Sequence, residues 1–152
     1  MRQDIEEYTL DEVQEGIRSI CDEIRASKMG FDFIVSISRG GLIPGVLMSH
    51  NLEIPLRVVE WSTRDTGLKL CPEDIKLSAQ QGKTILIVDD IVDSGLTIRE
   101  LIDSWELEDT PNIKVACLTY NIAQKLIKPD YFDSTINRDY NKNWINFWWE
   151  KK

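Results

Sequence analysis

Some segments of this chain have apolar residues at helical spacing, and others are short continuous apolar runs. This pattern predicts helices and strands that follow one another along the chain. Thr9 and Glu12 form a capping-box pattern, and the apolar residues that follow recur at helical spacing through about residue 25. Short apolar runs without alternation are typical of strands that are buried on both faces. We expect helices at 9–25, 46–51 and 97–106, and strands at 33–37, 56–61, 85–89, 113–120 and 131–136.

This order predicts one α/β domain over residues 1–152, with a mostly parallel twisted sheet flanked by helices. Residues 62–81 are the exception, because they are polar, contain Gly67 and Pro72, and have no clear period. Such a segment is either a mobile loop or a poorly patterned hairpin, and a binding lid has this composition.

Composition and charge narrow the possible functions. With 152 residues the chain can bury one core, and 26 acidic against 18 basic residues argue against a nucleic-acid surface. An acidic protein that binds a phosphate is expected to take it together with magnesium. Three scattered cysteines argue against a disulfide framework or a zinc site, and no apolar run is long enough to span a membrane. We therefore expect a soluble, cytoplasmic protein.

The chain's most informative segment is residues 84–97, TILIVDDIVDSGLT. An apolar strand leads into Asp89 and Asp90, at the carboxyl end where open α/β sheets bind ligands. Two adjacent carboxylates need partners, which ribose hydroxyls or a divalent cation could supply. Residues 94–97 then open a helix with two hydroxyls, a glycine and free backbone N–H groups, a combination that binds anions. The segment predicts a site for a phosphorylated sugar.

A second loop of this kind follows the strand at 33–37, with the sequence SISRGGL at residues 36–42. Adjacent glycines let backbone N–H groups approach an anion closely, and Arg39 lies beside them. Two phosphate-binding loops at the ends of two strands suit a ligand that carries two phosphate groups.

The run IVDDIVDSGLT at 87–97 resembles the phosphoribosyl pyrophosphate signature of type I phosphoribosyltransferases. Within that superfamily the chain is most similar to the xanthine-guanine and hypoxanthine phosphoribosyltransferases. Supporting segments are YTLD at 8–11, SRGGLIPG at 38–45 and the tail WINFWWE at 144–150. The resemblance implies that family's fold, with a lid at about 62–81 and a short C-terminal hood at about 120–152. It also implies transfer of a phosphoribosyl group to a purine, a Mg²⁺ cofactor, and a homodimer or homotetramer.

The resemblance also implies a role for each matching position. Asp89 and Asp90 would bind the ribose and the magnesium, and Asp93 would lie near the purine N7 as the proton-transfer group. Trp144 would stack on the purine, Ile145 would offer backbone contacts to its edge, and Glu150 would lie near its exocyclic group. A non-proline cis peptide bond is expected between Ser38 and Arg39. The 5′-phosphate would be held by Asp93, Ser94, Gly95, Leu96 and Thr97, and the pyrophosphate by Ser38, Arg39, Gly40, Arg64 and Lys69.

One position departs from the family pattern. Relatives that use 6-oxopurines have a lysine where this chain has Asn121, which can donate a hydrogen bond to the purine but carries no charge. Lys125 or Lys128 could substitute if the loop is rearranged. The identity of the base therefore stays open, and another base is an alternative.

Two further alternatives concern residue roles and function. The tryptophans of the tail could close the core or form a subunit contact, which we favour for Trp148 and Trp149 but not for Trp144. A protein with this site could also be a non-catalytic sensor of phosphoribosyl pyrophosphate. The acidic charge and the three aspartates of the signature favour the enzyme.

Overall fold

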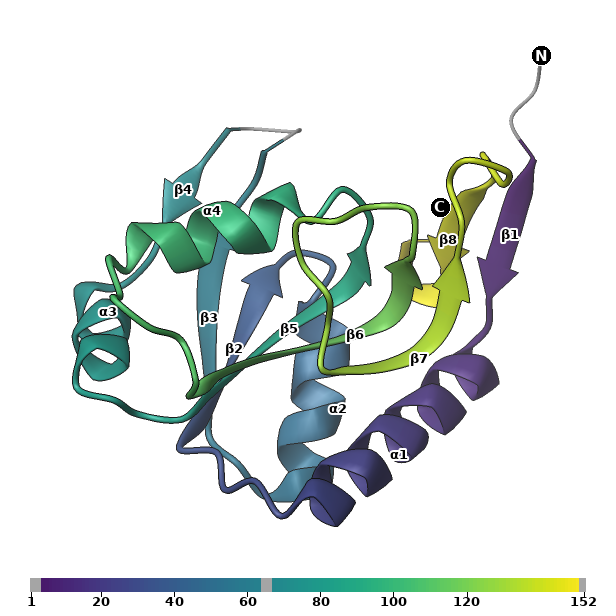
Figure 1. Cartoon of the computed structure of the whole chain (residues 1–152). Helices are drawn as coiled ribbons and strands as arrows, with labels where there is room; N and C mark the ends of the chain where they lie inside the picture. Colours follow the sequence, from purple (N-terminus) through teal and green to yellow (C-terminus); the bar gives the residue numbers. More distant parts are fainter. Residues whose placement is uncertain (1–3, 64–66, 151–152) are drawn as a thin grey trace.

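The computed structural model describes residues 4–63 and 67–150. A six-stranded sheet lies between two helical layers, with α1 and α2 on one face and α3 and α4 on the other (Figure 1). In chain order the elements are β1 (Ile5–Tyr8), α1 (Leu10–Ser27), β2 (Phe33–Ser38), α2 (Leu42–Leu52), β3 (Leu56–Trp61), β4 (Lys69–Leu70), α3 (Glu73–Gln80), β5 (Ile85–Val92), α4 (Leu96–Ser104), β6 (Ile113–Asn121), β7 (Tyr131–Ile136), β8 (Trp144–Phe147) and the 3₁₀ turn η1 (Trp148–Glu150).

The strand order β4-β3-β2-β5-β6-β7 confirms the predicted mostly parallel sheet. All neighbours are parallel except β3 and β4, which form an antiparallel pair at one edge. The apolar part of β5 is central, and Ile85, Leu86, Ile87 and Val88 are fully buried. Burial on both faces explains why this strand lacks alternation.

Helix α1 forms as its sequence predicts. The Thr9 hydroxyl accepts from the Glu12 N–H at 3.2 Å, and the Glu12 carboxylate accepts from the Thr9 N–H at 2.9 Å. This capping box satisfies two N–H groups that a helix start leaves free. The buried stripe of Val13, Ile17 and Ile20 then packs on the face of the sheet that α2 also covers.

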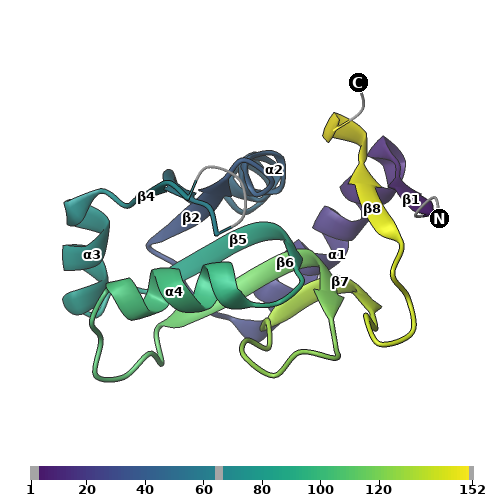
Figure 2. The ribbon, with the colours of Figure 1, turned by 90° about the horizontal axis from the view of Figure 1, so that it is seen from above.

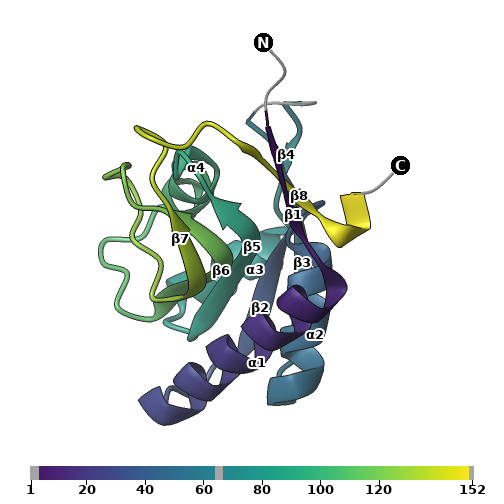
Figure 3. The same cartoon turned by 90° about the vertical axis from the view of Figure 1, so that its right-hand side faces the viewer.

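A second, two-stranded sheet joins the two ends of the chain. Strands β1 and β8 pair in parallel and lie apart from the main sheet (Figures 2 and 3). Neither strand was predicted, because β1 is short, contains Glu6 and Glu7, and has no buried residue. Phe147 at the end of β8 anchors the pair, since it is 1% exposed and belongs to the core beneath α1.

Two segments differ from the prediction, although the hairpin that was one alternative for residues 62–81 is present in part as the β3 and β4 pair. Helix α2 begins at Leu42 and not at residue 46, because Pro44 lies in the first turn, where no intrahelical N–H bond is needed. Residues 62–81 include β4 of a hairpin and the helix α3, which has only two buried residues, Ile75 and Ala79. Two apolar positions are too few to produce a helical period in the sequence.

Within the described residues, no helix has both the length and the apolar character of a membrane-crossing segment.

Candidate functional site

Asp89 and Asp90 lie inside β5, whereas the sequence placed them at its end. The strand continues to Val92 because β6 goes on pairing with it. On its other side, β5 pairs with β2 only as far as the register Ser36↔Val88. The two carboxylates therefore occupy the part of β5 from which one neighbouring strand has turned away. This opening at the carboxyl ends of β2 and β5 is where a ligand of an open α/β sheet is expected.

The loop after β2 fills the edge of this opening. A Cβ atom on Gly40 would lie 2.3 Å from Oδ2 of Asp90, and one on Gly41 would lie 2.5 Å from the carbonyl oxygen of Val88. Both distances are too short for a side chain unless something shifts, so the glycines allow the loop after β2 to pack against β5 and its carboxylates. The structure thus brings the predicted pyrophosphate-binding loop next to the acidic pair.

The acidic pair is strongly perturbed. Burial raises the pKa of the Asp89 carboxyl well above its usual range, and the neighbouring Asp90 charge raises it further. Burial also raises the pKa of Asp90, which is 9% exposed, although hydrogen bonds from Asp89 and Ile91 oppose the shift. Glu150, at the far end of the chain, is close enough to raise the Asp90 pKa through its charge. Two carboxylates held this way gain from a cation or from hydroxyl donors.

The predicted non-proline cis peptide bond is present between Ser38 and Arg39. It lies at the turn from β2 into the glycine pair. The Arg39 side chain is exposed, and among the described residues it has no ion pair. Its guanidinium is therefore available to an anion.

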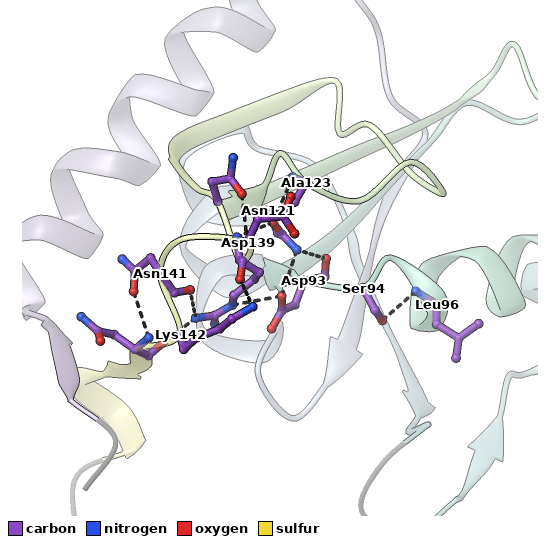
Figure 4. Close-up of polar contacts among 11 residues, drawn as sticks. Asp93, Ser94, Leu96, Asn121, Ala123, Asp139, Asn141 and Lys142 are labelled. Atoms are coloured by element: carbon purple, nitrogen blue, oxygen red, sulfur yellow. Dashed lines mark hydrogen bonds and ion pairs between the residues drawn. The ribbon is translucent and has the colours of Figure 1, made fainter. Parts of the chain in front are cut away.

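Ser94, Gly95, Leu96 and Thr97 form the start of α4. Gly95 has φ of +80°, which favours glycine, and it caps the helix without a side-chain hydrogen bond. The Ser94 hydroxyl accepts from the Leu96 N–H at 3.2 Å (Figure 4). Thr97 exchanges a hydrogen bond with Thr63 at 3.1 Å between hydroxyl oxygens. The helix start carries the partial positive charge that binds phosphate.

Asp93 is held by two residues from other elements. Nδ2 of Asn121 donates to the Asp93 carbonyl at 3.0 Å and to its carboxylate at 3.3 Å, and Nε of Arg138 donates to Oδ1 of Asp93 at 3.2 Å. Oδ1 of Asn121 accepts from the N–H groups of Ala123 and Arg138, both at 3.1 Å. Figure 4 shows the Asn121 side chain pointing toward Asp93. Both ends of the Asn121 amide are thus used within the protein.

Sequence reasoning missed Arg138. It follows β7 in a polar stretch with no apolar period, and the chain distance to Asp93 is 45 residues. An arginine within a polar segment between two strands was the only available signal, and it is a weak one.

The tail residues take up three different environments. Trp144 is 50% exposed at the start of β8, Ile145 is buried, and Oε2 of Glu150 accepts from the Phe147 N–H at 3.0 Å. Trp149 stacks on Phe147 with ring centroids 4.8 Å apart, and Trp148 meets Trp149 edge to face. Trp148 and Trp149 are partly buried and pack against the core, which is one of the two roles expected for them.

The predicted lid contributes two candidate residues, Arg64 and Lys69. Nζ of Lys69 pairs with Oε2 of Glu100 on α4 at 2.9 Å. Arg64 lies outside the described residues.

Known proteins with similar sequences or structures were compared with this chain. An orotate phosphoribosyltransferase from Brucella ovis is 32% identical over 117 residues, which are 76% of this chain and 57% of that protein. The purine phosphoribosyltransferase from Pyrococcus horikoshii Ot3 is 30% identical, with a TM-score of 0.76 and coverage of 98% of this chain and 95% of that one. A hypothetical protein from Neisseria gonorrhoeae with bound ppGpp is 25% identical, with a TM-score of 0.78 and coverage of 99% and 92%.

A mostly parallel sheet with a glycine loop and a carboxylate pair at the carboxyl ends of its strands is typical of open α/β proteins, which bind ligands at that edge. The phosphoribosyl transferase domain family matches residues 8–150, and the chain belongs to that family. Its fold is that of the type I phosphoribosyltransferases. The chain spans a little over half the length of the orotate enzyme it resembles.

Proposed function

We propose that this protein transfers the 5-phosphoribosyl group from phosphoribosyl pyrophosphate to a 6-oxopurine, which gives a nucleoside monophosphate and pyrophosphate. The observation that carries the proposal is the packing of Gly40 against Asp90, which places the glycine loop after β2 beside the carboxylate pair. The similarity to a purine phosphoribosyltransferase along 98% of the chain supports a purine as acceptor.

The sugar would bind at the acidic pair. Asp89 and Asp90 accept hydrogen bonds, so they suit the hydroxyls of the ribose. The start of α4, from Ser94 to Thr97, would hold the 5′-phosphate with backbone N–H groups, and Asp93 would contribute at the same turn. Ser38, Arg39 and Gly40 would contact the pyrophosphate, with Arg64 and Lys69 added from the lid.

The same carboxylates fit a Mg²⁺ ion that arrives with its substrate. The described residues contain no group of three or more acidic, histidine or cysteine side chains that could hold a metal alone. Mg²⁺ is commonly held by one or two carboxylates together with substrate phosphates and water, which matches Asp89 and Asp90. Bound there, the ion would supply positive charge to the departing pyrophosphate.

The base would lie between the turn at Asp93 and strand β8. Trp144 is half exposed and offers its ring face, while Ile145 would contribute backbone groups and Glu150 its free carboxylate oxygen. Asp93 would take up or return a proton at N7 as N9 attacks the anomeric carbon, a form of general acid–base help worth about 10²- to 10⁴-fold. The contacts of Asn121 suit a positioning role for Asp93 better than direct purine binding.

A base panel tests the proposal. Pyrophosphate release is measured with Mg²⁺, phosphoribosyl pyrophosphate, and each of xanthine, guanine, hypoxanthine, adenine, orotate and uracil. We expect turnover with at least one 6-oxopurine and a lower kcat/KM for adenine and the pyrimidines. Preferred use of orotate would overturn the purine assignment and keep the transfer reaction.

A regulatory protein is the second candidate, because a similar protein from Neisseria gonorrhoeae holds ppGpp. Such a sensor would bind phosphoribosyl pyrophosphate in calorimetry and release no pyrophosphate with any base. A cytoplasmic location and a homodimer or homotetramer stay predictions, and sedimentation velocity would test the second.

A further inference from the structure

Arg138 is placed to do more than support the loop after β7. Its side chain is 19% exposed, and its Nε is paired with Oδ1 of Asp93 at 3.2 Å. Nη1 donates to the carbonyl oxygen of Asn141 at 3.5 Å and to that of Asn143. Because Asn143 directly precedes Trp144, the guanidinium lies between the Asp93 turn and the first residue of β8.

The segment that carries Arg138 is itself fixed. The side chains of Asn141 and Asn143 donate to Oε1 of Glu6 on β1 at 2.8 and 2.9 Å, and the Trp144 N–H donates to the Asp4 carbonyl at 2.9 Å. Figure 4 shows Asn141 and Lys142 on the side of this network away from Asp93. The guanidinium is therefore held in one place before a base arrives.

A base with a carbonyl oxygen needs a donor in this region, and neither the Asp93 carboxylate nor the Asn121 amide is placed to supply one. A carboxylate at Asp93 only accepts, and Nδ2 of Asn121 already donates to the carbonyl and the carboxylate of Asp93. Asn121 is also only 6% exposed. Arg138 has five N–H groups, and within the described part of the chain its hydrogen bonds use Nε and Nη1 alone. The two N–H groups of Nη2 are left.

We propose that Arg138 is the residue that sets base specificity, by donating from Nη2 to the oxygen of a 6-oxopurine. This inference rests on the proposed function and names the group that selects its substrate. A positively charged donor stabilises an oxo group on the base. When the bound base lacks that oxygen, the Arg138 donor has no acceptor, which disfavours binding. The charge that Asn121 lacks is thereby supplied from a different loop.

The test compares two bases that differ at the 6-position, hypoxanthine and unsubstituted purine. Wild type, Arg138→Gln and Arg138→Lys are assayed for the KM of hypoxanthine, the inhibition constant of purine, and the KM of phosphoribosyl pyrophosphate. We expect Arg138→Gln to raise the hypoxanthine KM by about 10- to 100-fold, because a charged hydrogen bond is lost. The purine constant should change less than about threefold, and so should the KM of phosphoribosyl pyrophosphate.

Arg99→Gln is the matched control, because Arg99 also pairs through Nε with an aspartate, Asp103, on the exposed side of α4. It should leave all three constants unchanged. Thermal unfolding is followed for each variant. If Arg138→Gln does not fold, Arg138→Lys is the variant to test. It replaces the planar guanidinium with a single ammonium group, so the preference for hypoxanthine over purine should fall at least about threefold.

Equal losses for both bases, or an unchanged ratio, would overturn the assignment of Arg138 while leaving the transfer reaction intact. A wild-type protein that uses no base would instead overturn the proposed function together with this inference. A double variant, Asn121→Lys with Arg138→Gln, adds a gain-of-function arm. If this double variant regains hypoxanthine affinity, hypoxanthine binding requires a positive charge near its oxygen, whichever loop supplies that charge.

Discussion

At Gly40 the absence of a side chain determines whether the loop after β2 can lie against the carboxylate pair of β5. A Cβ atom there would lie 2.3 Å from Oδ2 of Asp90 and 2.5 Å from its Cγ. The Asp90 carboxylate cannot move away freely, because its Oδ1 accepts from the Ile91 N–H at 2.7 Å. Any larger residue at position 40 must displace either the loop or the carboxylate.

We predict that Gly40→Ala lowers kcat/KM for phosphoribosyl pyrophosphate by about 100-fold or more, since a displacement of about 1 Å at a reacting site can cost that much. Steady-state kinetics measures the loss. Gly30→Ala is the control, because a Cβ at Gly30 meets nothing within 4 Å. Equal activity of the two variants would show that the loop adapts and that Gly40 is not required.

The raised pKa of Asp90 predicts how the stability of the folded protein depends on pH. Its folded-state pKa is raised by burial to about 6, so the folded protein holds the proton more tightly than the unfolded chain. The stability from this group is complete below about pH 4 and is lost as the pH rises through about 6. Asp90→Asn should therefore raise the melting temperature at pH 8 and change it little at pH 4.

Thermal denaturation across that range is the measurement, and activity should fall at the same time because Asp90 is a proposed ligand of the sugar and the metal. Asp139→Asn, at an exposed position, serves as the control. A variant that melts earlier than wild type at pH 8 would mean that the buried charge is stabilised by a contact that outweighs its desolvation.

At the scale of elements, the sequence predicted the helices and strands that form because their own apolar residues are buried. The five longer strands of the main sheet and the helix α1 carry enough apolar residues to be recognised in the sequence, and each was located within a few residues. The two-residue strand β4 was not. Helix α3 and strand β1 were missed because their burial is slight and their partners lie far away in the chain. Asp89 and Asp90 were identified as a pair, but their place inside β5 depends on pairing with β6, which local sequence does not encode.

The hairpin of β3 and β4 is held against α4 by two contacts near the phosphate loop. Lys69 pairs with Glu100 at 2.9 Å, and Thr63 meets Thr97 at 3.1 Å. If Lys69 binds pyrophosphate, it must first leave Glu100. The ion pair would then compete with the substrate for the lysine.

We predict that Glu100→Gln lowers the KM for phosphoribosyl pyrophosphate about two- to fivefold, while Lys69→Met raises it about tenfold. Both should change the free energy of unfolding by less than about 1 kcal/mol, because the pair is partly exposed. Lys76→Met, which breaks a similar pair with Glu106 at 3.0 Å, is the control. An unchanged KM in Lys69→Met would remove Lys69 from the pyrophosphate site.

For the whole molecule, the proposed base-binding side of the site depends on the pairing of the two chain ends. Strand β8 carries Trp144 and is held by β1, and the pair is fixed to the main core by Phe147. The sequence motif at 144–150 pointed to base binding, yet the support from β1 could not be seen because it spans nearly the full length of the chain. The network from Asp93 through Arg138 to Glu6 likewise joins the signature loop to both ends.

Phe147→Ala tests this dependence. The ring lies 5.3 Å from that of Tyr8 and is stacked 4.8 Å from Trp149, so its removal leaves a cavity that both neighbours must fill. We expect the free energy of unfolding in urea to fall by about 3 to 5 kcal/mol, as for large buried aromatics. Tyr140→Ala, at an 88% exposed ring, should change it by less than about 0.5 kcal/mol.

A loss of base affinity in Phe147→Ala without a loss of stability would mean that β1 and β8 open separately from the main sheet. A loss of both would mean that the two sheets unfold as one unit, so that base binding and global stability share the same contacts.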